Sequence, residues 1–224
     1  TPCELCASRK QSLFSDLPET QLCTISDHKN LISHRKGQIL YYEGTKPLGI
    51  FCINSGVVKI YKTASNGKEQ IIHLAQKGDF LGYVALLEGG SYKETAEAME
   101  DSELAIIPKA DFDELMHSNS QVSQKFIQLL ARNVAEKEDH LLGLAYNSLR
   151  KKVADALISL QKKYQTGEGH FSINISRENL ASIAGTATES LIRTLGDFRS
   201  EKLIDIKDGH IVILNEKKLE NLLN

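Results

Sequence analysis

Two residues near the end of the chain, Glu189 and Arg193, place a carboxylate and a guanidinium four positions apart. An arginine can bond both acceptors on the edge of a guanine, and a carboxylate can accept from the amine of a cytosine. Four positions is just over one turn of an α-helix, so both side chains would project from one helix face. The spacing therefore indicates either contact with neighbouring base pairs or an i,i+4 ion pair on an exposed helix surface.

The sequence around this pair predicts the helix that would carry it. Residues 186–189, Thr-Ala-Thr-Glu, match a capping box, so we expect a helix that begins there and runs to about Ser200. Three apolar side chains on the opposite face would pack inward: Leu191, Leu195 and Phe198. The acid and the base would then face away from the core.

Neighbouring segments predict a DNA-binding motif around that helix. A shorter helix is expected from a Ser176 cap through Ala184, and Gly185 supplies the turn between the two. Two short helices across a tight glycine turn form a helix-turn-helix. The strand-like runs 203–206 and 211–214 flank a polar turn and predict a hairpin, the wing of a winged helix. A polar helix face that protrudes from this motif is what a major-groove reader requires.

Charge is distributed unevenly along the chain. The formal net charge is −2, from 27 Lys+Arg and 29 Asp+Glu. Residues 148–224 carry 12 basic and 10 acidic side chains, whereas residues 1–117 carry 12 and 16. A nucleic-acid face is therefore expected in the C-terminal third. Because the net charge of the whole chain is negative, a second class of function stays open: a ligand- or redox-sensing signalling module that acts through protein contacts without binding DNA.

Residues 36–108 predict a compact all-β unit. Asn66-Gly67 lies between two strand-like runs and is a strong hairpin signal. The predicted strands are residues 37–42, 49–53, 57–61, 70–74 and 104–107. Strands that repeat at this interval favour a sandwich, a barrel or a jelly roll.

A long amphipathic helix is predicted from Ser120 to about Leu144 and would measure about 36 Å. That is longer than a small domain needs, so we expect part of its apolar stripe to meet a second copy of the chain in a parallel dimer. The alternative is that the stripe packs only on the β unit. The residues expected in the dimer seam are Val122, Phe126, Leu129, Asn133, Val134 and Leu141.

The chain as a whole predicts an α+β protein in three parts. These are an N-terminal segment with a β-roll sensor (1–117), a dimerisation helix (118–147) and a winged helix-turn-helix (148–224). No apolar run approaches a membrane span, and the first residues lack the features of a signal peptide, so a cytoplasmic protein is expected. No nucleophile elbow, phosphate-binding loop or metal-binding histidine pair occurs, which argues against an enzyme.

The segment 185–198 resembles the recognition segment of the CRP/FNR family of bacterial transcription regulators, whose motif has Glu, three residues and then Arg. Residues 78–82, 96–102 and 106–108 are similar to that family's cyclic-nucleotide-binding-type jelly roll. The resemblance covers nearly the whole chain. It implies a jelly roll (a double-stranded β-helix), a long dimerisation helix and a winged helix-turn-helix, in a homodimer bound to a pseudo-palindromic site on double-stranded DNA. RNA polymerase is then an expected further partner.

The resemblance also implies roles for single residues. Glu189 and Arg193 would read bases, and Thr188 stands where the family has a further Arg. Contacts with the DNA backbone, or mixed contacts, are expected from Thr188, Ser190, Arg177, Arg199 and Lys202.

The predicted effector pocket departs from the cyclic AMP-binding branch of the family. That branch has a Glu after the Gly-Asp-Phe-x-Gly motif and an Arg-Ser pair further on, where this chain has Tyr83 and Glu94-Thr95. Because a carboxylate repels a cyclic phosphate, cyclic AMP bound in the usual mode is not expected. Candidates to line a pocket for another ligand are Gly78, Leu81, Gly82, Tyr83 and Thr95.

The cysteines offer a second sensing hypothesis. The N-terminal Cys-x-x-Cys pair resembles the start of the iron–sulfur motif of the FNR-type oxygen sensor, but Ser12 and Ala105 stand where that motif has its other two cysteines. An iron–sulfur cluster held by this chain would need the remaining thiols. The alternatives are reduced thiols without a role, or a thiol/disulfide or metal switch. The candidate residues are Cys3, Cys6, Cys23 and Cys52.

Overall fold

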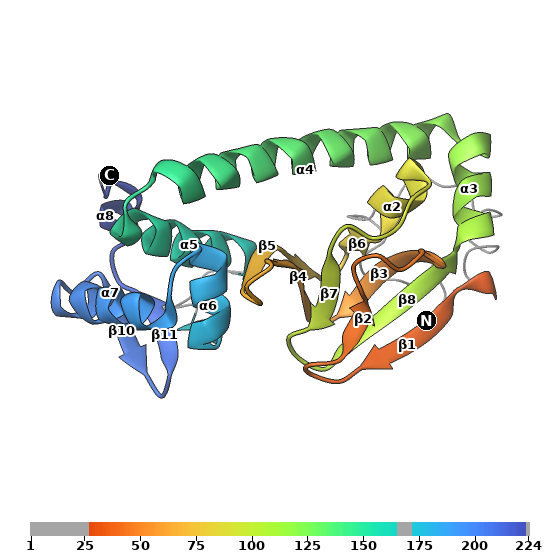
Figure 1. Cartoon of the computed structure of the whole chain (residues 1–224). Coiled ribbons are helices and arrows are strands. Elements are labelled where there is room, and N and C mark those ends of the chain that lie inside the picture. The colour runs from red at the N-terminus through yellow and green to blue at the C-terminus, as the bar shows by residue number, and fades with distance from the viewer. Residues whose placement is uncertain (1–26, 165–171, 223–224) are drawn as a thin grey trace. The chain divides into compact units, whose positions relative to one another are not determined.

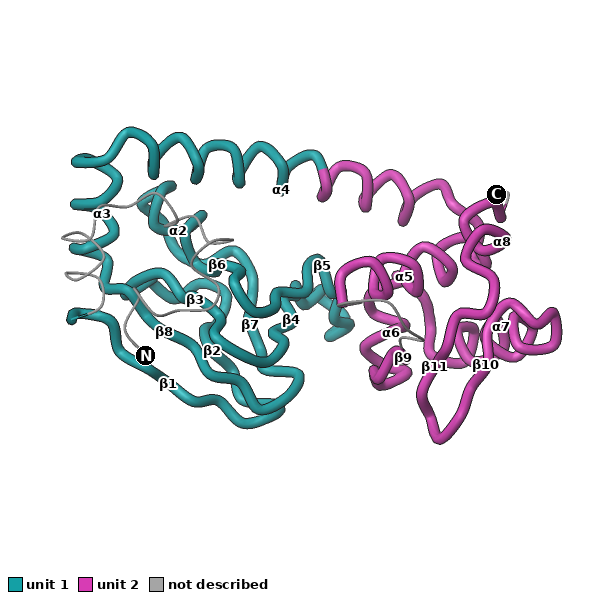
Figure 2. The backbone as a smooth tube through the Cα atoms, turned by 180° about the vertical axis from the view of Figure 1, so that it is seen from behind, with its two compact units in different colours: residues 1–135 teal, residues 136–224 magenta. Residues whose placement is uncertain are grey.

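The computed structural model describes residues 27–164 and 172–222 (Figure 1). The chain forms two compact units, residues 1–135 and residues 136–224 (Figure 2). The division between the units falls within the longest helix, α4 (Ser120–Tyr146).

Unit 1 contains the predicted jelly roll, which is confirmed. Two four-stranded antiparallel sheets, in the orders β1-β8-β3-β6 and β2-β7-β4-β5, make up the roll. The strands are β1 (Asn30–His34), β2 (Ile39–Tyr41), β3 (Gly49–Ser55), β4 (Val57–Thr63), β5 (Glu69–Gln76), β6 (Phe80–Leu81), β7 (Thr95–Ala98) and β8 (Ser102–Pro108).

The β4–β5 hairpin forms where the sequence predicts it. Gly67 has a φ of 78°, a conformation that glycine adopts without a steric penalty. The side chain of Asn66 accepts from the backbone N–H of Lys68 at 3.1 Å, and the N–H of Ala64 donates to the Lys68 carbonyl at 2.8 Å. The Asn-Gly turn therefore sets the register of this strand pair.

The helices of unit 1 pack on the roll through an apolar cluster centred on Phe126. These helices are α2 (Tyr83–Glu88), α3 (Lys109–Ser118) and the first half of α4. The ring of Phe126 is fully buried and lies 5.2 Å from that of Phe112 and 6.0 Å from that of Phe80, between centroids. The predicted place of Val122 and Phe126 in a dimer seam is therefore wrong, because both belong to the core of their own chain.

Unit 2 contains the predicted helix-turn-helix and wing, and both are confirmed. The helices are α5 (Leu149–Tyr164), α6 (Arg177–Ala184), α7 (Thr188–Ser200) and α8 (Glu216–Glu220). The strands β9 (Ser172–Ile173), β10 (Ile204–Lys207) and β11 (His210–Ile213) form one sheet in the order β10-β11-β9. The core of this unit includes the fully buried side chains of Leu157, Leu180, Leu191 and Phe198.

The ends of α6 follow the sequence signals, whereas the start of α7 does not. The side chain of Ser176 accepts from the backbone N–H of Asn179 at 3.1 Å, and Gly185 adopts the left-handed conformation at φ 61°. The predicted capping box from Thr186 is wrong, because the N–H of Thr186 donates to a carbonyl of α6 and closes that helix. Ala187 is the N-cap of α7 instead, and its side chain makes no capping hydrogen bond.

Within residues 27–164 and 172–222, every helix is too short or too polar to span a lipid bilayer.

Candidate nucleic-acid interface

One face of α7 is anchored in the core of unit 2. Leu191, Leu195 and Phe198 are at most 2% exposed. Thr194 is also buried, and its hydroxyl donates to the carbonyl of Ser190 at 2.9 Å, so its polar group is satisfied within the helix. Because this face is packed on α5 and α6, the opposite face of α7 is held outward on a rigid support.

Arg150 of α5 fixes the C-terminal end of α7. Its guanidinium donates to both carboxylate oxygens of Glu201, at 2.9 and 2.7 Å, and lies 4.9 Å from the centroid of the Phe198 ring. A second carboxylate, that of Asp197, is 4.0 Å away. Both hydrogen bonds to Glu201 come from Nη2, and charge-assisted contacts of this kind are shorter and stronger than neutral ones. No local sequence pattern predicts this contact, because Arg150 and Glu201 are 51 residues apart.

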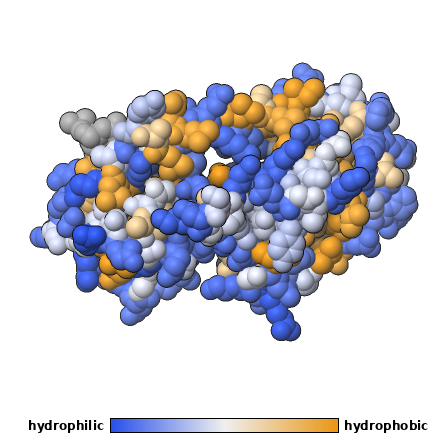
Figure 3. Space-filling view, viewed as in Figure 1, coloured by the Kyte–Doolittle hydropathy of each residue, from blue (hydrophilic) through white to orange (hydrophobic). Residues whose placement is uncertain are grey.

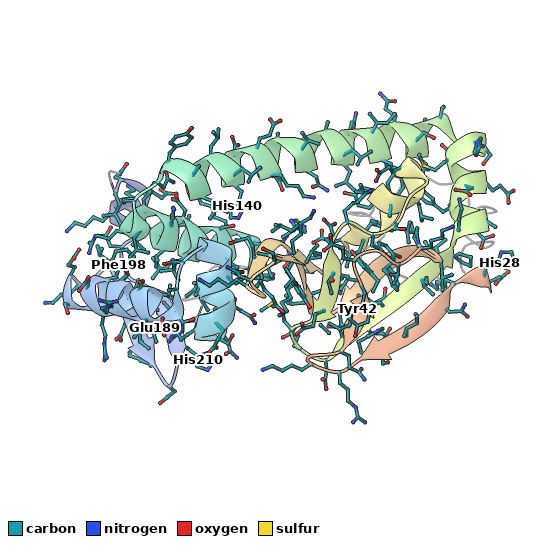
Figure 4. The ribbon with its side chains drawn as sticks, in the orientation of Figure 1. His28, Tyr42, His140, Glu189, Phe198 and His210 are labelled. Atoms are coloured by element: carbon teal, nitrogen blue, oxygen red, sulfur yellow. The ribbon has the colours of Figure 1, made fainter. Side chains whose placement is uncertain are left out.

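The outward face of α7 carries the predicted acid and base. Glu189, labelled in Figure 4, lies in the first turn, Arg193 follows one turn later, and both side chains are exposed. Among the residues that the structure describes, neither side chain makes a hydrogen bond or an ion pair, so the i,i+4 surface pair that the spacing allowed does not form. The carboxylate and the guanidinium are therefore both available to a partner without breaking an internal contact.

Four other predicted DNA contacts lie on or near α7. Thr188 and Ser190 are half-buried at the start of the helix, and Arg199 and Lys202 are exposed at its end. The Nε of Arg199 lies 3.6 Å from the Oδ1 of Asp205, so part of its charge is compensated. Lys202 has a φ of 57°, the left-handed conformation in which the chain leaves the helix.

Arg177 supports the wing. Its Nη2 donates to the carbonyl of Gly209 at 3.0 Å, from the first residue of α6 to the turn between β10 and β11. That turn has φ values of 50° at Asp208 and 82° at Gly209, the left-handed conformations of a tight hairpin. The exposed Lys207 stands beside it. The start of the helix-turn-helix and the tip of the wing are thus joined directly.

The exposed apolar stripe of α4 shares two residues with the predicted seam and lacks the other four. Leu129 packs against the Phe126 cluster, and Asn133 donates to the hydroxyl of Tyr83, so both face their own roll. Three exposed apolar side chains of α4 repeat every seven residues: Val134 (54% exposed) and Leu141 (64%), which belong to the predicted seam, and Ile127 (62%), which does not. Apolar surface lies along α4 at the upper edge of Figure 3. Counting back seven residues from Val134 would have identified Ile127, which was missed because apolar residues at spacings of three and four were included as well.

The predicted effector pocket lies in a region of the roll that is filled by aromatic rings. The rings of Tyr41 and Tyr92 stack with centroids 3.8 Å apart, and a Cβ added at Gly82 would lie 3.2 Å from the Tyr92 ring. Burial raises the pKa of Tyr92 to about 12. Leu81 belongs to the same buried cluster as these rings, and Tyr83 belongs to the Phe126 cluster.

The other two predicted pocket residues are engaged in backbone structure. Gly78 lies in a turn at φ 92°, and its N–H donates to the carbonyl of Ile53 at 2.8 Å. Thr95 is 9% exposed, and its hydroxyl accepts from the backbone N–H of Glu43 at 3.1 Å.

The cysteine hypothesis falls mostly on residues that the structure does not describe. Cys3, Cys6 and Cys23 lie outside the described residues, and Cys52 lies half-buried on β3, packed against the Phe126 cluster. Within the described ranges, no three His, Cys, Asp or Glu side chains are grouped so that they could hold a metal ion. The iron–sulfur cluster and the thiol switch therefore stay predictions.

Comparison with protein families finds two matching domain models. A cyclic nucleotide-binding domain matches residues 31–119, and a Crp-like helix-turn-helix domain matches residues 151–222. The fumarate and nitrate reduction regulatory protein of Escherichia coli K12 is 26% identical over 222 residues, which cover 92% of this chain and 88% of that protein. The cyclic AMP receptor protein of Thermus thermophilus is 28% identical over 187 residues, 84% of this chain and 85% of that protein.

Solved structures share the fold. FixK2 from Bradyrhizobium japonicum aligns with a TM-score of 0.79 at 24% identity, over 87% of this chain and 96% of that one. A transcriptional regulator of the CRP/FNR family from Eubacterium rectale aligns with a TM-score of 0.75 at 26% identity, over 93% and 95% of the two chains.

Proposed function

Because the chain belongs to the CRP/FNR family of DNA-binding transcription regulators, we propose that the outward face of α7 reads base edges in the DNA major groove. Arg193 would bond a guanine through O6 and N7, and Glu189 would accept from the amine of a cytosine. The observation that carries this proposal is that the acid and the base are exposed on one face of a helix whose other face is anchored in the core.

A selection of bound duplexes from a random pool tests this function. The bound sequences should contain guanine and cytosine at fixed neighbouring positions. Affinity for them should fall with salt, with a log-log slope near −0.9 for each phosphate neutralised. If no sequence is enriched and no duplex binds at low salt, the module acts through protein contacts instead.

We propose that two copies of the chain form a dimer through the exposed apolar stripe of α4. Ile127, Val134 and Leu141 repeat every seven residues, and β-branched residues such as the first two favour a parallel pair of helices at such positions. Two copies joined in this way would offer two α7 helices to the half-sites of a pseudo-palindrome.

Around the base-reading pair, we propose that polar and basic groups hold the DNA backbone. Thr188 and Ser190 lie at the start of α7, Arg199 and Lys202 at its end, and Arg177 beside the wing. RNA polymerase is the further partner expected of a regulator of this kind, and the cytoplasm is where we propose that it acts.

We further propose that the roll does not bind cyclic AMP in the family's usual mode. The Tyr92 ring supports this, since it lies beside Gly82 and is itself stacked on the buried Tyr41. Burial raises the pKa of the Tyr41 phenol well above its usual value, and the negative charge of Glu94 raises it further. Calorimetric titration with cyclic AMP should give no heat of binding, and saturable binding at micromolar nucleotide would contradict the proposal.

A redox signal is the other candidate, and it rests on the Cys-x-x-Cys pair at Cys3 and Cys6. Protein purified without oxygen should then absorb visible light and lose that absorbance in air. A colourless preparation with four titratable thiols would rule out a cluster.

A further inference from the structure

The readout face of α7 carries a third exposed side chain, and this one is apolar. Ile192 is 53% exposed, although it lies in the middle of a helix that buries four other residues. At about 100° per residue, Ile192 lies about 60° from Glu189 on one side, and Arg193 lies about 40° from it on the other. The carboxylate of Glu189 is thus flanked by a cation and by a branched hydrocarbon.

The surface around Ile192 is open. Gly196 lies one turn further along the same face, and a Cβ added there would meet no atom within 4 Å. The buried residues of α7 are centred on the side opposite Glu189, and the one nearest to Ile192 is Leu195, about 60° away, so Ile192 lies at the edge of the outward face. More than half of the surface of Ile192 is nevertheless exposed, so its side chain is accessible to a partner that Glu189 and Arg193 contact.

The major groove displays one apolar group, the C5-methyl of thymine. We propose that Ile192 is a specificity-determining residue that packs on this methyl at a base pair next to those read by Glu189 and Arg193. The inference rests on the proposed function, since it requires that α7 enters the groove. It adds a T·A preference to the guanine and cytosine preferences of the polar pair.

Deoxyuridine provides a direct test, because it differs from thymine only by the missing methyl. In a duplex selected by the wild-type protein, each thymine is replaced in turn by deoxyuridine, and binding is measured by fluorescence anisotropy. Replacement of one particular thymine in each half-site should weaken binding about fourfold per half-site, the value of one buried methyl group. Ile192→Ala should bind the unmodified duplex more weakly and should respond little to that replacement.

Leu214→Ala is a matched control. Leu214 is exposed to nearly the same extent, 54%, but lies beyond the end of β11 and not on α7. This variant should keep the full response to deoxyuridine. Ile192→Val, which keeps a branched side chain, should keep most of it and guards against a folding defect in the alanine variant.

Two outcomes would overturn the inference. If no thymine in the duplex responds to deoxyuridine, wild-type Ile192 contacts no methyl group. If one responds equally in wild type and in folded Ile192→Ala, another residue makes the contact. In both cases a guanine preference that depends on Arg193 would still stand, so the failure of this inference differs from a failure of the proposed function, in which no duplex is selected at all.

Discussion

Arg193→Ala separates DNA recognition from folding. Its guanidinium is exposed and has no hydrogen bond or ion pair with any residue in the described part of the chain. Its removal should therefore change the free energy of unfolding by no more than about 0.5 kcal/mol. Urea denaturation of the variant and the wild type measures this difference.

The effect of Arg193→Ala on DNA should be much larger. A bidentate contact with guanine contributes about 1 to 3 kcal/mol, so each half-site should lose about 5- to 140-fold in affinity. Anisotropy titrations would use the selected duplex, the same duplex with the guanine position changed, and a random duplex. The variant should bind the first two almost equally, because the discrimination is lost.

Lys202→Ala is the control for this prediction. A phosphate contact carries no sequence information, so this variant should weaken binding to all three duplexes alike and reduce the salt slope by about one per half-site. Equal losses on the selected and the random duplex for Arg193→Ala would refute the role given to Arg193.

Four further predictions concern the support of the interface. Val134→Glu places a charge in the proposed dimer seam, so sedimentation velocity should show monomers and specific DNA affinity should fall. Arg150→Ala removes the ion pair with Glu201 and the contact with the Phe198 ring; since Arg150 is partly exposed, the loss in urea denaturation should be only about 1 to 2 kcal/mol. Phe126→Ala empties the centre of a buried cluster and should cost about 3 to 5 kcal/mol in the same assay. Gly196→Ala should raise unfolding stability by about 0.5 to 1 kcal/mol, because nothing crowds that position in the free protein.

The helix-turn-helix could be predicted from sequence because its signals are local. Ser176 caps α6 and Gly185 closes it, within ten residues of each other. The hairpin of the wing follows from its polar turn at Asp208 and Gly209. The start of α7 shifted from Thr186 because the closing turn of α6 uses that residue's N–H.

The orientation of α4 could not be predicted in this way. Apolar side chains occur on two adjacent faces, one containing Phe126 and one containing Ile127. Phe126 faces inward because Phe80 and Phe112, distant in sequence, surround it. The spacing of apolar residues predicts that the segment is a helix, but it does not predict which face is buried, since both faces have the same spacing.

Strand β7 of the roll could not be predicted from its own sequence either. Its sequence, Thr-Ala-Glu-Ala, has little intrinsic strand preference. It is a strand because it pairs with β2 on one side and β4 on the other, with Ala96 opposite both Tyr41 and Ile60. Such pairing depends on residues 34 or more positions away, which no local pattern reports.

Methylation interference on the selected duplex tests the central claim most directly, because it marks guanine N7 in the major groove. If two α7 helices read that groove, methylation should block wild-type binding at guanines in two successive major grooves about 10 base pairs apart, and Arg193→Ala should lose this sensitivity. Binding that no guanine methylation affects, or that is blocked equally in the variant, would contradict the claim that Arg193 reads guanine from α7.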